Sequence, residues 1–205
     1  MEISRKGVEY IRALEGNWGT TAKVERISKV VHIGHGQTYY SDGSKVQLGD
    51  VRTKEFINTD FLKIVKKYAS EVNSAIRVPV KQYQFDALVA FHYNCSGAFA
   101  NKTIPNLINA GKSDAEIVSW WKTHYITAGG NVQKELITRR LHDSQIWQGL
   151  PYRLGNGKIF YYNEPANTGG DTGSESGSNS NSTLLIIGAA AAIVAGVIIS
   201  KKNEK

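Results

Sequence analysis

The sequence predicts an α+β fold, in which a small antiparallel sheet and a larger, mostly helical lobe enclose a cleft. Two observations carry this prediction. β-Branched and aromatic residues are concentrated between residues 22 and 40, whereas apolar residues recur at helical spacing in segments between Asp50 and about residue 150. The length of 205 residues, with 41% apolar residues, suits one well-packed globular domain.

The predicted elements follow in order along the chain. Val8, Ile11 and Leu14 share one helical face and Gly16 is a stop signal, so the first helix is expected to end near Glu15. Residues 22–28 and 29–40 then form the sheet, with a turn at 41–44. The helical part has five segments, at residues 53–76, 82–94, 103–111, 113–125 and 136–149.

The chain is expected to divide into four parts. Composition changes sharply after the helical segments, from mixed residues to Gly, Ser and Asn with a few acids, and then to an uninterrupted apolar run. The parts are a folded domain at 1–163, a flexible tether at 164–182, a transmembrane helix at 183–200 and a short basic tail at 201–205.

The C-terminal apolar run predicts a single-pass membrane anchor. Lysines follow it, which favours a cytoplasmic C-terminus with the domain on the other side of the membrane. Gly188, Ala192 and Gly196 recur every four residues, a small-residue face through which two such helices could pair in the membrane.

The folded part is basic. The whole chain carries a formal charge of +7, and omitting residues 164–205, which hold three basic and four acidic residues, leaves +8. This charge suits an anionic partner. The basic residues are scattered and form no stripe interleaved with aromatics, so we expect no nucleic-acid partner. Cys95 is the single cysteine, expected to be a small buried residue.

Glu15 is the candidate catalytic acid. It follows Ile11 by one helical turn, so its carboxyl flanks the buried face at the negative end of the helix dipole. Burial and the dipole both favour the protonated carboxyl. A carboxylic acid that keeps its proton and faces a cleft can act as a general acid.

Several short motifs occur in a fixed order over about residues 5–150. "ALEG" at 13–16 precedes a short strand and then "VVHIGHGQT" at 30–38, and "QYQFDALVAFHYNCSGAF" follows at 82–99. Further blocks lie at 103–111, 128–130 and 135–143. This ordered set resembles the phage-type lysozymes, the endolysin muramidases. The resemblance implies a lysozyme-like α+β fold. It also implies hydrolysis of the β-1,4 bond between N-acetylmuramic acid and N-acetylglucosamine in bacterial peptidoglycan. We expect no cofactor.

The resemblance also assigns the catalytic positions. Glu15 falls on the family's general acid. The family's second carboxylate lies about nine residues later and its threonine six beyond that, whereas here Glu25 is ten residues on and His32 takes the place of the threonine. Gln37 replaces the family's usual histidine. The catalytic set implied by the resemblance is therefore Glu15, Glu25 and His32, with the base and the threonine both altered.

Three further residues are implied to bind the substrate. Tyr93 and Asn94, near the end of the segment at 82–94, correspond by analogy to groups that line the family's cleft. Arg139 is similar to one of the family's paired arginines, which can support the region of Glu15 electrostatically.

His32 has two interpretations. In the first, its neutral imidazole takes a proton from water or stabilises a developing oxocarbenium ion, and Glu25 assists electrostatically. In the second, it is a hydrogen-bonded strand residue, the site lacks its base, and the domain binds glycan without cutting it. No metal site is expected, because His32 and His35 lie on opposite faces of an extended strand and no further ligands cluster nearby.

Two functions follow from these interpretations. The first is a membrane-anchored phage lytic enzyme that acts on peptidoglycan during host lysis or virion entry, located in the virion membrane or the host inner membrane. The alternative is a catalytically inactive, lysozyme-like protein that binds the cell wall or is a structural protein of a virion membrane. Glu15 favours the first function, whereas the altered base and threonine favour the second.

Overall fold

A computed structural model of the chain describes residues 1–153, except 26–28, 96–98, 100–102 and 129, together with residues 159–160. The predicted tether, membrane helix and basic tail, and the predicted domain boundary at residue 163, lie outside the described residues. Over the part of the chain that is described, no helix combines the length and apolar character that crossing a membrane requires.

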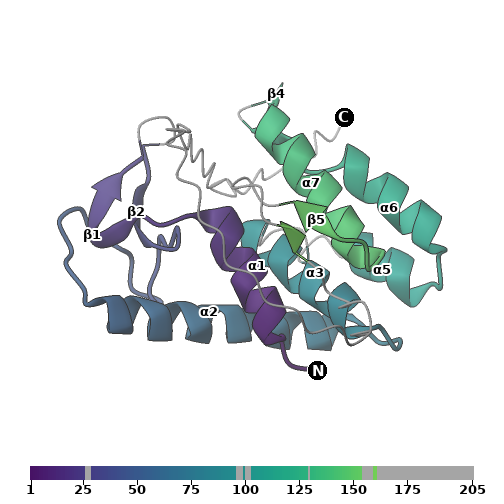
Figure 1. The fold of residues 1–205 in the computed structure, drawn as a ribbon, viewed down its shortest axis with the longest axis horizontal. Coiled ribbons are helices and arrows are strands. Elements are labelled where there is room, and N and C mark those ends of the chain that lie inside the picture. Colours follow the sequence, from purple (N-terminus) through teal and green to yellow (C-terminus); the bar gives the residue numbers. More distant parts are fainter. Residues whose placement is uncertain (26–28, 96–98, 100–102, 129, 154–158, 161–205) are drawn as a thin grey trace, which may run out of the picture.

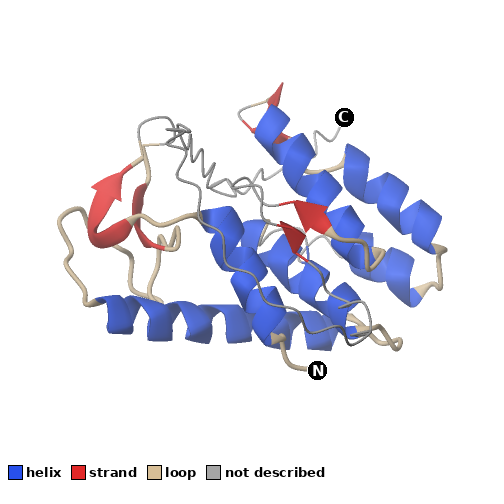
Figure 2. Ribbon diagram, in the orientation of Figure 1, coloured by secondary structure: helices blue, strands red, loops and turns tan. Residues whose placement is uncertain are grey.

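Two lobes share one long helix, α2 (Lys54–Ala75), which passes beneath both of them (Figure 1). The small lobe holds β1 (Gly19–Val24) and β2 (Val31–Gly34), and α1 (Arg5–Glu15) leads into it. Helices make up most of the larger lobe (Figure 2). Its elements are α3 (Gln82–Asn94), α5 (Thr103–Asn109), α6 (Asp114–Thr123), β3 (Thr127–Ala128), β4 (Asn131–Val132), α7 (Lys134–Trp147), β5 (Tyr152–Arg153) and β6 (Ile159–Phe160).

The small lobe is an irregular antiparallel hairpin packed on α2. Its register pairs Gly19 with Gly34 and Lys23 with His32, so β1 carries more residues than β2 between the two pairs. Such a bulge bends the strand and increases its twist. The lobe has a small apolar core of its own, formed by Ala22, Ile33, Tyr40, Val46 and, from α2, Ile57.

The larger lobe is built around α3. Every residue of this helix from Phe85 to His92 is buried, and the helix packs against α1, α2 and α7. A helix that is apolar over most of its surface belongs in the interior of a bundle. Because α3 ends at Asn94, beside the C-terminal end of α1, this central helix brings its last turn to the junction of the two lobes.

Most predicted elements are confirmed. The first helix ends at Glu15 as expected. Ser113 and Glu116 form a capping box at the start of α6. Cys95 is buried. The strand predicted at 29–40 is wrong in length, because β2 ends at Gly34. Gly34 and Gly36 have φ angles of +61° and +79°, a left-handed conformation that turns the chain out of the strand.

Candidate active site

A cleft of about 460 Å³ lies between the two lobes, where the sequence predicts it. Four segments line it: the end of α1, the loop that follows β2, the middle of α2 and the end of α3. Its lining includes Glu15, Tyr39, Lys63, Lys67, Tyr93 and Asn94. Three of the six sequence-predicted site residues, Glu15, Tyr93 and Asn94, therefore meet in one cavity.

Glu15 is a buried carboxyl at the wall of this cleft. Its side chain is 10% exposed, and Oε1 accepts a hydrogen bond from Nη2 of Arg139 at 2.5 Å. The two residues are 124 positions apart, so the contact joins α1 to α7. Burial lowers the pKa of Arg139, but the charges of Glu15 and Asp143 outweigh it and raise that pKa above its ordinary value. Arg139 therefore stays a cation, and it holds one oxygen of Glu15.

Arg139 lies next to Glu15 but outside the lining of the cleft. Its side chain is 11% exposed, and it is not among the residues that line the cleft. Its observed contact is with Glu15, as expected of an arginine that supports the region of Glu15 electrostatically.

A buried polar network lies next to this ion pair. Arg140 is fully buried and pairs with Asp143 at 3.0 Å, and it donates hydrogen bonds to Oδ1 of Asn94 at 2.7 Å and to Sγ of Cys95 at 3.0 Å. The hydroxyl of Tyr10 donates to Asp143 at 2.9 Å. The network links α1, the end of α3 and α7, so it fixes the framework that carries Glu15.

The second oxygen of Glu15 faces the loop that follows β2. A Cβ built on Gly36 would lie 3.2 Å from Oε2, so the backbone of this loop approaches the carboxyl closely. The loop is held to α2 through Gln37, whose Nε2 donates to Oδ2 of Asp60 at 3.0 Å, and through Ser41, whose backbone N–H donates to Oδ1 at 3.0 Å. Gln37 and Asp60 are both buried.

His32 lies inside the small lobe. It is fully buried, and it is not among the cleft-lining residues. Nδ1 lies 3.2 Å from the carbonyl oxygen of Gly36, to which a protonated Nδ1 donates, and the indole of Trp18 stacks on the imidazole with ring centroids 4.7 Å apart. Among the described residues, Nε2 has no hydrogen-bond partner. His32 therefore contacts the loop that faces Glu15 but does not itself reach the cleft.

Glu25 and His35 both lie outside the lining of the cleft. Glu25 is half-buried directly after β1, and its backbone N–H donates to the carbonyl of Val30 at 2.8 Å. The two ring nitrogens of His35 lie 3.2 Å from the carbonyl oxygen of Gly16 and 3.2 Å from Oδ1 of Asn58. These contacts give His35 a structural role between α1, the loop and α2.

Tyr93 and Asn94 line the cleft from the last turn of α3. Burial and then the negative charge of Glu15 raise the pKa of Tyr93 well above its ordinary value, so its phenol keeps the proton that it donates to the carbonyl of His35 at 3.1 Å. Oδ1 of Asn94 accepts a hydrogen bond from Arg140, so this end of the amide is not available to a ligand. Of these two residues, the aromatic ring of Tyr93 and the amide nitrogen of Asn94 are the groups that can contact a substrate.

Several cleft residues were missed by the reasoning from sequence, among them four with aromatic or basic side chains. Tyr39 comes from the loop after the sheet, and Lys63, Lys67 and Tyr68 come from α2. The signal available in the sequence was the spacing of the lysines, because residues i and i+4 share one helix face. Within the described residues, no group of three or more His, Cys, Asp or Glu side chains could hold a metal ion.

Comparisons with known proteins agree with this geometry. Residues 14–143 match the family model described as phage lysozyme. An endolysin of Bacillus phage PZA is 33% identical over 162 residues, which cover 77% of this chain and 59% of that endolysin. The chain thus spans less than two thirds of the length of this curated relative.

Two solved structures have a similar fold. The endolysin from Escherichia coli O157:H7 phage FAHEc1 superposes with a TM-score of 0.61 at 33% identity, over 72% of this chain and 93% of that one. The muramidase domain of SpmX from Asticaccaulis excentricus gives a TM-score of 0.60 at 25% identity, over 71% of this chain and 97% of that one.

Proposed function

Because the chain belongs to the phage lysozyme family, we propose that it is a glycoside hydrolase of bacterial peptidoglycan with Glu15 as its general acid. The observation that carries this proposal is the position of Glu15, a buried carboxyl at the wall of the cleft between the lobes. The names of the relatives, endolysin and muramidase domain, support the same class of substrate.

We propose that the bond it hydrolyses is the β-1,4 bond between N-acetylmuramic acid and N-acetylglucosamine. A general acid must protonate the oxygen of the leaving sugar. Since Arg139 holds Oε1, the proton is delivered from Oε2, the oxygen that faces Gly36. Arg139 then stabilises the carboxylate left after the transfer, because it is a permanent cation at hydrogen-bond distance.

The partner of Glu15 in the reaction is proposed to be His32, with Glu25 assisting. His32 has a buried Nε2 without a partner among the described residues, and Trp18 covers one face of its ring. To accept a proton from water, this Nε2 would have to become accessible from the cleft. The loop with Gly36 connects the two groups, because its carbonyl is bonded to His32 and its Cα lies next to Glu15.

A second candidate function is binding of the cell wall without hydrolysis. The observation that favours it is the absence of His32 and Glu25 from the lining of the cleft, where Glu15 is then the only one of the three proposed catalytic groups. A domain with an acid but no base would keep its affinity for glycan and lose the chemistry.

One experiment separates the two functions. The full chain is added to purified peptidoglycan, and the fall in turbidity is compared for the wild type, Glu15→Gln and His32→Ala. Glu9→Gln is the matched control, because Glu9 lies on the same helix but is exposed and paired with Arg5. We expect Glu15→Gln to lose at least about a hundredfold in rate and Glu9→Gln to clear normally. Wild-type protein that sediments with peptidoglycan but never clears it would establish the second function instead.

We further propose that residues 183–200 anchor the domain in a membrane, either of the virion or of the host, for lysis or for entry. The apolar composition of this segment supports the proposal. Pairing of two such helices through Gly188, Ala192 and Gly196 belongs to the same proposal. Sedimentation of the expressed chain with membranes after an alkaline carbonate wash is the expected result. Release into the supernatant would contradict the anchor.

A further inference from the structure

The middle of α2 presents two lysines to the cleft that contains Glu15. Lys63 and Lys67 are one helical turn apart, both are exposed, and both line this cavity. Residues at this spacing lie about 5 to 6 Å apart at their Cβ atoms, so the two ammonium groups can contact one ligand together or two neighbouring anionic groups.

The charge of these lysines is not neutralised within the described part of the chain. Among the described residues, neither ammonium forms an ion pair with a carboxylate, whereas Glu15 is paired with Arg139. Asp60, on the preceding turn of α2, accepts hydrogen bonds from Gln37 and Ser41 instead. The α2 wall of the cleft therefore carries two unpaired positive charges, which favour an anionic ligand.

The surroundings of the two lysines suit a substituted sugar. Ile64 and Tyr68 lie beside them on the same wall. Tyr39, which is 53% exposed, lines the cleft from the loop of the small lobe. Exposed aromatic rings and apolar side chains pack against the faces of sugars, while ammonium groups bind acids attached to them.

We propose that Lys63 and Lys67 form a subsite for the carboxylates of the peptide branches that peptidoglycan carries on its muramic acid sugars. The inference rests on the proposed function. Each bond that the cleft would cut adjoins a sugar with such a branch, so acidic groups enter the cleft with the glycan. Phosphodiester polymers also bear negative charge, but they are linked to the glycan at widely spaced sugars and would rarely lie at the bond being cut.

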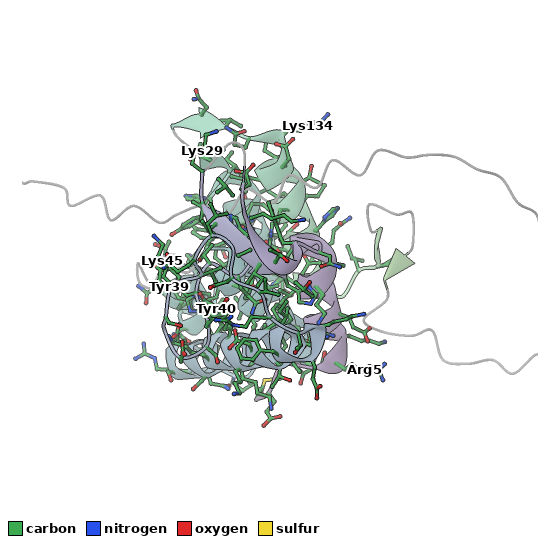
Figure 3. The ribbon with its side chains drawn as sticks, turned by 90° about the vertical axis from the view of Figure 1, so that its left-hand side faces the viewer. Arg5, Lys29, Tyr39, Tyr40, Lys45 and Lys134 are labelled. Atoms are coloured by element: carbon green, nitrogen blue, oxygen red, sulfur yellow. The ribbon has the colours of Figure 1, made fainter. Side chains whose placement is uncertain are left out.

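The test compares Lys63→Gln/Lys67→Gln with the wild type in the full chain, on purified peptidoglycan at low and high salt. Lys66→Gln is the matched control, because Lys66 is exposed on the same helix but lines a different groove, together with Arg5, Val8 and Arg12 of α1. Arg5 projects from the opposite side of the molecule to Tyr39 (Figure 3).

We expect the double variant to raise KM about tenfold at low salt with little change in kcat. The increase should shrink at high salt, because exposed charges are screened. Lys66→Gln should stay within about twofold of the wild type. On peptidoglycan whose carboxylates have been converted to amides, the double variant and the wild type should have the same KM.

Three results would overturn the subsite. The double variant could match the wild type on intact peptidoglycan, or its defect could persist on the amidated material. The defect could also disappear when hydrofluoric acid removes phosphodiester polymers, which would assign the lysines to phosphate. If the wild type cleaves no substrate, the proposed function fails, and sedimentation of the same variants with intact and amidated peptidoglycan still decides whether the lysines bind carboxylates.

Discussion

Gly36 combines a left-handed backbone conformation with a close approach to Glu15. Its φ of +79° is a conformation that other residues adopt at a cost, and a Cβ there would lie 3.2 Å from Oε2 of Glu15. Gly49 has a similar φ of +86°, but no atom lies within 4 Å of the place where its Cβ would be. Substitutions at the two glycines can therefore distinguish the effect of backbone strain from the effect of contact with the carboxyl.

We expect Gly36→Ala and Gly49→Ala to lose comparable stability, about 1 to 2 kcal/mol each, because both place a Cβ at positive φ. Only Gly36→Ala should also lower the rate of peptidoglycan clearance, because its methyl group displaces the oxygen proposed to deliver the proton. Urea unfolding and turbidity assays measure the two effects. Equal rates for the two folded variants would show that Gly36 matters only for the backbone.

At the scale of the elements, α1, α3 and α7 are joined by the buried pair of Arg140 and Asp143. Both side chains are fully buried; Tyr10 donates a hydrogen bond to Asp143, and Arg140 donates one to Asn94. Removing one member of such a pair leaves an uncompensated charge in the interior.

Asp143→Ala should therefore destabilise the protein by about 3 to 5 kcal/mol. Glu9→Ala is the control, since it removes one partner of an exposed pair on α1 and should change the unfolding midpoint little. The measurement is the free energy of unfolding in urea for both variants. A loss for Asp143→Ala as small as that for Glu9→Ala would mean that the network does not hold the helices together.

The elements were predictable to different degrees for physical reasons. The helix that ends at Glu15 and the central α3 were predicted, because the spacing of apolar residues and a stop signal are local properties of the sequence. The contact of Glu15 with Arg139 was not, because the two residues are 124 positions apart and meet only when α7 packs on α3. The complete burial of His32 depends in the same way on tertiary structure, including its stacking on Trp18.

At the scale of the whole molecule, two histidines make stability depend on pH. Burial lowers the pKa of His92, and the hydrogen bond from its ring to Glu71 offsets this only in part. Burial also lowers the pKa of His142. In both cases the unfolded chain binds a proton more readily than the folded one, so stability is complete above the unfolded pKa of 6.5 and falls as pH drops below it.

We expect the free energy of unfolding to decrease from about pH 6.5 downwards, and the decrease to be shallower in His92→Gln. Urea unfolding at several pH values between 5 and 8, for both proteins, gives the two slopes. Identical slopes would show that burial of His92 contributes nothing to the pH dependence.

Mass spectrometry of the fragments that the wild-type chain releases from purified peptidoglycan, after borohydride reduction, tests the central claim most directly. A hydrolase with Glu15 as acid should release saccharides that end in reduced N-acetylmuramic acid, and Glu15→Gln should release none. Anhydro sugar ends, reduced N-acetylglucosamine ends or free peptides would each assign the protein to a different class of wall-degrading enzyme and contradict the account.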